Sequence, residues 1–349
     1  MMFHNIYNNR RVLLTGDTGF KGSWLRLWLE ELGANVLGYS LPPSTQPNHF
    51  SLLGYSRSEY YDIRDLSCLE RVFADFQPEM VFHLAAQPLV RLSYQIPVET
   101  FETNVMGTIN VLEASRKTPS VRAIVAITTD KCYENKEQIW GYRESDPMGG
   151  YDPYSASKGC AELAISAYRR SFFQKENSPL LASARAGNVI GGGDWSADRL
   201  VPDIIKAASA GQRVEIRSPN STRPWQHVLE PLSGYLLLGQ RLWEGRREFA
   251  QSWNFGPSDG VRTVLETVKE MQKSWDKIQF VVNEPQDAPH EAQNLTLDCT
   301  KANIKLGWKP VWSTEQAVKQ TAAWYKEYYE NNWNISSELE IKEYVRSEQ

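Results

Sequence analysis

The sequence lacks the features that define several classes of protein. No apolar run approaches the ~20 residues that a transmembrane helix needs, and the polar residues 1–11 lack the apolar core of a secretory signal. The formal net charge is −4, so no basic surplus favours a nucleic-acid or anionic-membrane partner. No internal repeat or low-complexity segment interrupts the chain. We therefore expect a globular protein without a nucleic-acid or membrane partner.

Cysteine is also scarce. The 349 residues include four cysteines, which lie far apart and form neither a CxxC pair nor a disulfide framework. We therefore expect free thiols, no metal site and a reducing, cytoplasmic location. Because the chain has no positive surplus, any anionic substrate must be bound by individual arginines.

A glycine turn near the N-terminus is typical of a dinucleotide site. Residues 11–15 read as a buried strand, and residues 23–32 have helical periodicity. The turn between them has the spacing GxxGxxG, which lets a pyrophosphate approach the backbone and the helix N-terminus. A tight turn without a ligand would give the same pattern. The candidate cofactor-binding residues here are Gly16, Thr18, Gly19, Phe20 and Lys21.

The ends of the next two strands are candidates for contacts with the adenosine half of the cofactor. No acid follows the second strand, where Ser40 stands in the usual place of the ribose-binding Asp or Glu. We predict NAD, but the residues leave NADP open, because Lys21 and Arg64 could accommodate a 2′-phosphate. After the third strand, Asp62 and Ile63 are candidates for binding adenine. Asp65 is expected to cap the helix that follows.

Two further strands complete the predicted cofactor site. The fourth strand ends in a turn of small residues, and the fifth, residues 121–127, is rich in Val and Ile. His83 is expected to be a structural histidine rather than a catalyst. The candidate cofactor-binding residues of these strands and their helices are Leu84, Ala85, Ala86, Gln87, Asn104 and Thr128.

Two groups of residues could transfer protons. Tyr154 and Lys158 are four apart in a predicted helix and would share one face, where the ammonium is expected to lower the phenol pKa and make it a base. Both are also expected to contact the cofactor. Thr129, Asp130 and Lys131 follow the fifth strand, at the edge where such sheets bind ligands. A half-buried Tyr beside a solvated Lys, and an ordinary polar strand end, would give the same patterns.

The strand and helix rhythm predicts an α/β fold, a Rossmann-type doubly wound parallel sheet with a smaller mixed α/β substrate-binding lobe. We place the NAD-binding domain at residues 1–189, with later segments returning to it, and the substrate-binding lobe at 190–333. Residues 334–349 read as a charged, peripheral tail. The candidate substrate-binding residues are Arg199, Arg217 and Arg223, whose guanidinium groups can bind phosphate, and the family resemblance given next adds Asn188 and His290.

Several motifs together resemble the extended short-chain dehydrogenase/reductase family over nearly the whole chain. They include the glycine turn, Asp62-Ile63-Arg64-Asp65, Thr103-Asn104-x-x-Gly107-Thr108, Tyr154-x-x-x-Lys158 and Asn254-Phe255-Gly256. Within the family, four stretches are most similar to the nucleotide-sugar 4,6-dehydratases, and among these to the CDP-glucose group. They are residues 87–94, 129–133, 187–195 and 223–228.

The resemblance implies a lyase that uses NAD, acts on CDP-glucose, forms a homodimer and serves the synthesis of dideoxyhexoses for O-antigen. Tyr154, assisted by Lys158, would remove the proton of the glucose 4-hydroxyl while hydride passes from C4 to NAD⁺. Thr129 would hydrogen-bond the same oxygen. Water would then leave from C6, and the hydride would return there.

The elimination residues depart from the pattern of related dTDP-glucose dehydratases, which carry Asp-Glu where this chain has Asp130-Lys131. Asp130 can serve as the acid at O6. Lys131 can take the C5 proton only if burial or nearby charge lowers its pKa, and otherwise it would orient or stabilise the enolate. A nucleotide-sugar 4-epimerase, or a dehydratase of dTDP-glucose or GDP-mannose, remains the alternative.

Overall fold

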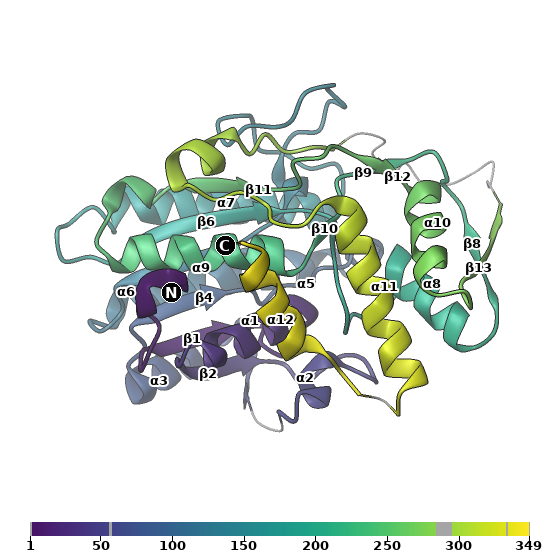
Figure 1. Cartoon of the computed structure of the whole chain (residues 1–349). Coiled ribbons are helices and arrows are strands. Elements are labelled where there is room, and N and C mark those ends of the chain that lie inside the picture. The colour runs from purple at the N-terminus through teal and green to yellow at the C-terminus, as the bar shows by residue number, and fades with distance from the viewer. Residues whose placement is uncertain (1, 56–57, 284–294, 333, 349) are drawn as a thin grey trace.

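A single parallel sheet forms the centre of the molecule (Figure 1). The computed structural model describes residues 2–55, 58–283, 295–332 and 334–348. The seven strands run in the order β11-β6-β5-β4-β1-β2-β3. They are β1 (Arg11–Thr15), β2 (Asn35–Ser40), β3 (Glu59–Tyr60), β4 (Met80–His83), β5 (Ala123–Ile127), β6 (Leu180–Ala186) and β11 (Ser252–Phe255). The order reverses between β1 and β4, so the fold is the predicted doubly wound one, with its ligand crevice at the carboxyl ends of the strands.

Helices cover both faces of this sheet, and the apolar character of the inner strands follows from that burial. Every residue of β4 and β5 is buried, as expected for parallel strands covered on both sides. On one face lie α3 (Leu66–Phe76), α6 (Gly107–Lys117) and α7 (Pro153–Ser171). On the other lie α1 (Phe20–Glu31) and α9 (Leu229–Trp243).

The remaining helices are short or belong to the second half of the chain. They are α2 (His49–Leu52), α4 (Val90–Gln95), α5 (Pro97–Phe101), α8 (Leu200–Ser209), α10 (Val264–Ser274), α11 (Thr314–Glu330) and α12 (Ser337–Ser347). Single turns of 3₁₀ or π-helix occupy η1 (Met2–Asn5), η2 (Glu102–Met106), η3 (Asp130–Cys132), η4 (Arg247–Phe249) and η5 (Ala302–Leu306). Among the described residues, no helix has both the length and the apolar character that crossing a membrane requires.

A smaller mixed lobe stands beside the sheet, on the right in Figure 1. In it β8 (Arg213–Ile216) pairs in parallel with β13 (Gln279–Val282), and β9 (Thr222–Arg223) pairs antiparallel with β12 (Arg262–Thr263). A further pair, β7 (Val189–Ile190) and β10 (Gln226–His227), leads out of the sheet edge. Because α9 and β11 return to the sheet, the second half of the chain is interleaved with the first. The boundary at residue 190 stays a prediction.

The C-terminal segment differs from the predicted peripheral tail. Helix α12 packs against α1 (Figure 1), and Ile341 and Tyr344, three residues apart on one face, are buried. The Tyr344 hydroxyl donates to Oε2 of Glu230 at 2.7 Å, and its ring meets Trp28 edge-on at 5.7 Å. The charged residues occupy the outer face of an amphipathic helix, so the helix belongs to the core despite its polar composition.

Candidate active site

The predicted site residues come together because parallel strands end at one edge of the sheet. The turn after β1 supplies the glycines, the segments after β2 and β3 supply Ser40 and Asp62, and the turn after β4 supplies Ala85. Thr129 follows β5, between the β4 and β6 ends, and α7 brings Tyr154 to the same edge. The fold thus brings residues that are up to roughly 140 positions apart in the sequence into one crevice.

The turn from β1 to α1 is shaped to receive an anionic group. Gly16 has φ +79°, and a Cβ there would lie 2.7 Å from the backbone nitrogen of Ala85, so only glycine fits. Gly19 begins α1 without a side-chain cap, which leaves the amides of the first turn without a side-chain acceptor. A Cβ on Gly19 would meet only the Gly16 oxygen, at 3.3 Å. This open, uncapped helix start fits the pyrophosphate of a dinucleotide.

A buried acid in this turn was missed by sequence reasoning. Asp17 is fully buried; its Oδ1 accepts hydrogen bonds from Ser40 at 2.6 Å and Ser58 at 2.9 Å, and its Oδ2 pairs with Arg26 at 2.8 Å. The Ser40 hydroxyl, predicted to bind the ribose, therefore donates to Asp17 instead. Asp62, predicted to bind adenine, accepts two hydrogen bonds from the Arg64 guanidinium, at 2.9 and 2.7 Å. Their contacts with a cofactor remain predictions.

The β4 end is held by an amide network around Asn104. Its side chain accepts from the Gln87 amide at 2.9 Å and donates to the Gln87 carbonyl at 3.1 Å and to Ser157 at 2.9 Å. The interior amide thus has the partners that burial requires. His83 is hydrogen-bonded to Thr15 and Thr108 on its two ring nitrogens, and burial lowers its pKa to about 3. It is a neutral, structural residue, as predicted.

Helix α7 places Tyr154 at its first turn. Asp152 caps the helix by accepting from the Ser155 amide at 2.9 Å, and Pro153 occupies the first helical position. The Tyr154 amide donates to the Ser93 hydroxyl at 3.1 Å, which ties the helix start to α4. Tyr154 and Lys158 are both buried on the predicted common face.

The predicted lowering of the Tyr154 pKa is wrong for this structure. Burial raises the pKa of Tyr154 to about 12, and a hydrogen bond with Thr129 only partly opposes it. Burial and repulsion from Lys21 lower the pKa of Lys158 to about 8, so this ammonium is easily lost. Local spacing predicted the neighbours but could not weigh desolvation against attraction.

The proton-handling group forms a continuous chain. Thr129 acts on the Tyr154 phenol, whose pKa it helps to lower, and it donates to Oδ1 of Asp130 at 2.9 Å. Asp130 is buried, whereas Lys131 is exposed. The structure therefore brings Tyr154, Thr129 and Asp130 together and leaves Lys131 without burial, one of the two conditions under which it was predicted to act as C5 base.

A cavity of about 170 Å³ opens beside the group formed by Tyr154, Thr129 and Asp130. Asp130, Gly187, Gln226 and Phe255 line it, together with the segment 256–260 of the smaller lobe. A Cβ on Gly187 would lie 1.8 Å from Oδ2 of Asp130, so this glycine leaves the room that the carboxyl occupies. The cavity is therefore the place where a substrate group can meet Asp130.

The predicted substrate-binding residues differ in their placement. Arg199, at the start of α8, pairs with Asp194 at 2.9 Å and acts electrostatically on Tyr154 and Lys21. Asn188 has φ +50° and accepts the Gln226 amide at its carbonyl, at 3.2 Å. Arg223 lies half-buried on β9, and Arg217 is exposed after β8. His290 lies outside the described residues.

Sequence reasoning also missed a buried ion pair between helix α7 and strand β6, behind the site. Glu162, one turn after Lys158, accepts from Thr128 at 2.6 Å and pairs with Arg185 of β6 at 2.8 Å. The Thr128 hydroxyl therefore faces Glu162. The i, i+4 spacing from Lys158 to Glu162 was the available signal, since it places Glu162 on the same helix face.

Comparisons with known proteins agree with this geometry. A model of the GDP-mannose 4,6 dehydratase family matches residues 13–321. The CDP-glucose 4,6-dehydratase of Salmonella typhimurium strain LT2 is 50% identical over 354 residues, covering 99% of each chain. The chain belongs to the GDP-mannose 4,6-dehydratase family, within the extended short-chain dehydrogenases/reductases. This confirms the family resemblance that the sequence motifs predicted.

Solved structures extend the family likeness to the fold. The UDP-glucose 4-epimerase of Thermotoga maritima, solved with UDP-glucose, has a TM-score of 0.77 and 25% identity, covering 93% of this chain and 100% of that one. The dTDP-glucose 4,6-dehydratase of Bacillus anthracis, solved in complex with NAD, has a TM-score of 0.73 at 20% identity, covering 93% and 98%. This chain thus shares its fold with both of these proteins.

Proposed function

We propose that the protein is a CDP-glucose 4,6-dehydratase with NAD as its cofactor. The observation that carries this proposal is the buried Asp130, joined through Thr129 to Tyr154 and facing a cavity. Oxidation at C4 needs only a base and a cofactor, but loss of water from C6 also needs an acid placed nearby. The 50% identity to the Salmonella enzyme over 99% of the chain supports CDP-glucose as the substrate.

The chain's own residues account for the proton transfers. The glycine turn after β1 would hold NAD, which would supply the hydride chemistry at C4 and C6. Tyr154 takes the proton of the 4-hydroxyl, and Thr129 hydrogen-bonds the same oxygen. Because burial raises the Tyr154 pKa to about 12, the phenolate must be stabilised by positive charge when the site is filled. Lys158 and Arg199 are the cations of this chain proposed for that role.

Asp130 then delivers a proton to O6, which leaves as water. The new C4 ketone acidifies C5, and Lys131 acts there, by taking the C5 proton or by stabilising the enolate. Lys131 is exposed in the structure, without the burial that would favour the first role, and we propose the second. The net reaction leaves the cofactor unchanged and removes one water molecule.

The nucleotide diphosphate is proposed to lie between the sheet edge and the smaller lobe. Arg199 and Arg223 carry guanidinium groups on the lobe side, and a guanidinium can bind phosphate through two hydrogen bonds. Arg217, Asn188 and His290 remain proposed contacts of the same substrate.

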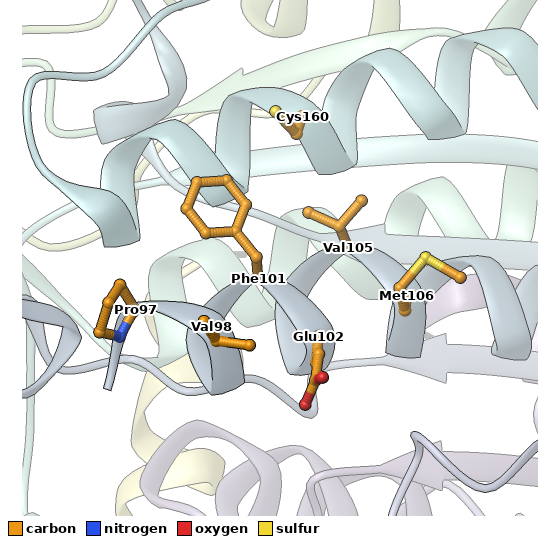
Figure 2. A pocket seen from close by; sticks show the side chains of 7 residues that line it. All are labelled: Pro97, Val98, Phe101, Glu102, Val105, Met106 and Cys160. Carbon is orange, nitrogen blue, oxygen red and sulfur yellow. The ribbon is translucent and has the colours of Figure 1, made fainter.

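An apolar groove supports a homodimer. Figure 2 shows Phe101 and Val105 pointing from the α5–η2 helix toward Cys160 of α7. Val98 and Met106 of the same groove are 70% and 49% exposed, and Leu163, one turn after Cys160, is 61% exposed. Two long helices with adjacent apolar faces match a second copy of this chain related by a two-fold axis.

The cellular setting follows from the proposed reaction. The product, a 4-keto-6-deoxy sugar nucleotide, suits the synthesis of dideoxyhexoses for the O-antigen of lipopolysaccharide. The four cysteines are all free thiols in the structure, which agrees with the proposed reducing cytoplasm.

One assay tests the proposed function. The purified protein is incubated with NAD⁺ in four separate reactions, which contain CDP-glucose, dTDP-glucose, UDP-glucose or GDP-mannose. The masses of the products are measured by mass spectrometry. We expect CDP-glucose alone to lose the mass of one water. Dehydration of another sugar nucleotide would overturn the substrate, and an isomer of unchanged mass would indicate a 4-epimerase.

A further inference from the structure

Two buried oxygen atoms, on residues that line the cavity beside Thr129 and Asp130, have no hydrogen-bond donor among the described residues. They are Oδ2 of Asp130 and Oε1 of Gln226. Both side chains line the same cavity, and both residues are 2% exposed. Buried polar atoms in native proteins are nearly always hydrogen-bonded, so two orphan oxygens in one small cavity point to a ligand that supplies the donors.

The orientation of the Gln226 amide is fixed by its other end. The Nε2 group donates to the carbonyls of Gly187, at 3.2 Å, and Phe255, at 3.0 Å. A flipped amide would set an oxygen against these two carbonyls, so the nitrogen must stay there. The backbone is held as well, because β10 pairs with β7. Oε1 is therefore a fixed acceptor without a donor, on a residue that lines the cavity.

The role of the other oxygen, Oδ2 of Asp130, follows from the hydrogen bond between Thr129 and Asp130. Thr129 donates to Oδ1 of Asp130, so Oδ1 is already an acceptor and Oδ2 is the atom left to carry and release a proton. Oδ2 lies against Gly187, the residue whose carbonyl also holds Gln226. One glycine thus contacts both orphan side chains.

We propose that Gln226 and Asp130 together form the subsite for the C6 hydroxyl of the hexose and for the water molecule it becomes, an inference that rests on the proposed dehydratase function. In the bound sugar, the single O6–H donates to Gln226, while O6 faces the proton on Asp130. In elimination the C6–O6 bond breaks with its electron pair on O6, and O6 takes the proton from Oδ2. The C5 proton leaves to a base, and its electron pair forms the C5=C6 bond.

The departing water has two O–H groups, and the subsite then has two acceptors, the Asp130 carboxylate and Oε1 of Gln226. As O6 gains its second proton, its O–H groups become more acidic and donate more strongly. The hydrogen bond to Gln226 is therefore stronger in the transition state than in the bound sugar, so Gln226 accelerates elimination rather than binding alone. Gln226 is a specificity residue for a sugar that carries a 6-hydroxyl.

The test separates the two half-reactions in the variant Gln226→Leu. The wild-type protein first defines which nucleotide sugar is dehydrated, so failure of the proposed substrate appears there and not in the variant. With that sugar, C4 oxidation is followed by the absorbance of reduced nicotinamide, and dehydration by mass spectrometry of quenched samples. We expect elimination to slow by roughly 10- to 100-fold, with reduced nicotinamide accumulating at an unchanged rate. Wild-type dehydration, or an equal loss of both steps, would overturn the subsite.

Two further measurements guard against a variant that simply packs poorly. The 6-deoxy analogue of the sugar nucleotide has no O6, so its Kd should be the same for the wild type and Gln226→Leu; a large loss would indicate general damage and count against the proposal. In Gln226→Glu, a protonated side chain can still donate to one of the two carbonyls and accept in the cavity. We expect this variant to eliminate faster at pH 6 than at pH 8, and a wild-type pH profile would contradict the assignment.

Discussion

Arg185 of β6 and Glu162 of α7 form a buried ion pair in which Nη2 and Oε2 are 2.8 Å apart. Burial alone would raise the pKa of Glu162, but the Arg185 charge and the hydrogen bonds from Arg185, Thr128 and Ser183 together outweigh it and hold this pKa below its usual range. Arg185 also donates to the Tyr133 hydroxyl at 2.7 Å, and Ser183 donates to Glu162 at 2.9 Å. The pair therefore fixes α7, the helix of Tyr154 and Lys158, against strand β6 of the sheet.

Breaking this pair should destabilise the protein. Arg185→Met leaves Glu162 as an uncompensated buried charge, and we expect a loss of about 3–5 kcal/mol in the free energy of unfolding. Urea unfolding followed by circular dichroism measures it. The double variant Glu162→Leu, Arg185→Met should lose less than Arg185→Met alone, because it removes both charges. Additive losses would mean that the two side chains act independently.

Tyr154→Phe should abolish turnover while the sugar nucleotide still binds. The variant removes only the hydroxyl that hydrogen-bonds Thr129, and the ring still fills its place. We expect a fall in kcat of at least about 10³-fold, in the upper part of the range for general-base catalysis, with substrate Kd within a few-fold by calorimetry. Tyr168→Phe, on the same helix but bonded to Glu113, is the matched control and should keep normal turnover. Near-normal turnover by Tyr154→Phe would exclude the mechanism.

The double variant Asp130→Asn, Lys131→Ala should oxidise C4 but stall at elimination. Of the single variants, we expect Asp130→Asn to have the larger effect, because Asp130 is buried beside the cavity and Lys131 is exposed. Single-turnover mass spectrometry with the 4-keto intermediate as the readout distinguishes the two steps. Lys136→Ala, another exposed lysine of the same segment, is the control. Full dehydration by the double variant would remove both residues from these roles.

Turnover should decline as the pH rises through about 8. Burial and Lys21 lower the pKa of Lys158 from 10.5 to about 8, so the folded protein loses this proton well before an exposed lysine would. An ammonium that stabilises the Tyr154 phenolate is then lost on the alkaline side. Lys21→Met removes a repelling charge, so the alkaline decline in kcat should move to higher pH. An unmoved decline would show that Lys158 does not control it.

Charged substitutions in the apolar groove should dissociate the proposed dimer. Val98→Glu and Met106→Glu place carboxylates on two exposed positions that a second copy would cover. Sedimentation velocity should show a dimer for the wild type and a monomer for these variants. Ile304→Glu, at a position 76% exposed and outside the groove, should leave the dimer intact. A wild-type monomer would contradict the proposal directly.

The cofactor half of the site could be predicted from the sequence because its signals are local. A glycine turn between a strand and a helix, and a tyrosine four residues before a lysine, are set by backbone geometry over a few residues. The parallel sheet then follows, because successive strand and helix units share one handedness and their ends meet at one edge. Asn104 was recognised for a similar reason, since an amide on an apolar helix face needs partners.

The contacts that depend on residues distant in the chain could not be predicted in the same way. The orientation of Gln226 depends on carbonyls at positions 187 and 255, and the partner of Asp17 comes from positions 40 and 58. The raised pKa of Tyr154 depends on burial by segments that are distant in the chain. Helix α12 was predicted to be a peripheral tail because the residues that bury its apolar face lie in α1 and α9, far away in the sequence.

The sequence by itself determined the doubly wound sheet, the family and the residues that end each strand, because periodicity and turn chemistry act over short distances. Only the tertiary structure decided which of those side chains are buried, which are already hydrogen-bonded and which face the cavity with an unused oxygen. Desolvation and hydrogen-bond satisfaction are properties of the whole packed environment, and no local pattern encodes them.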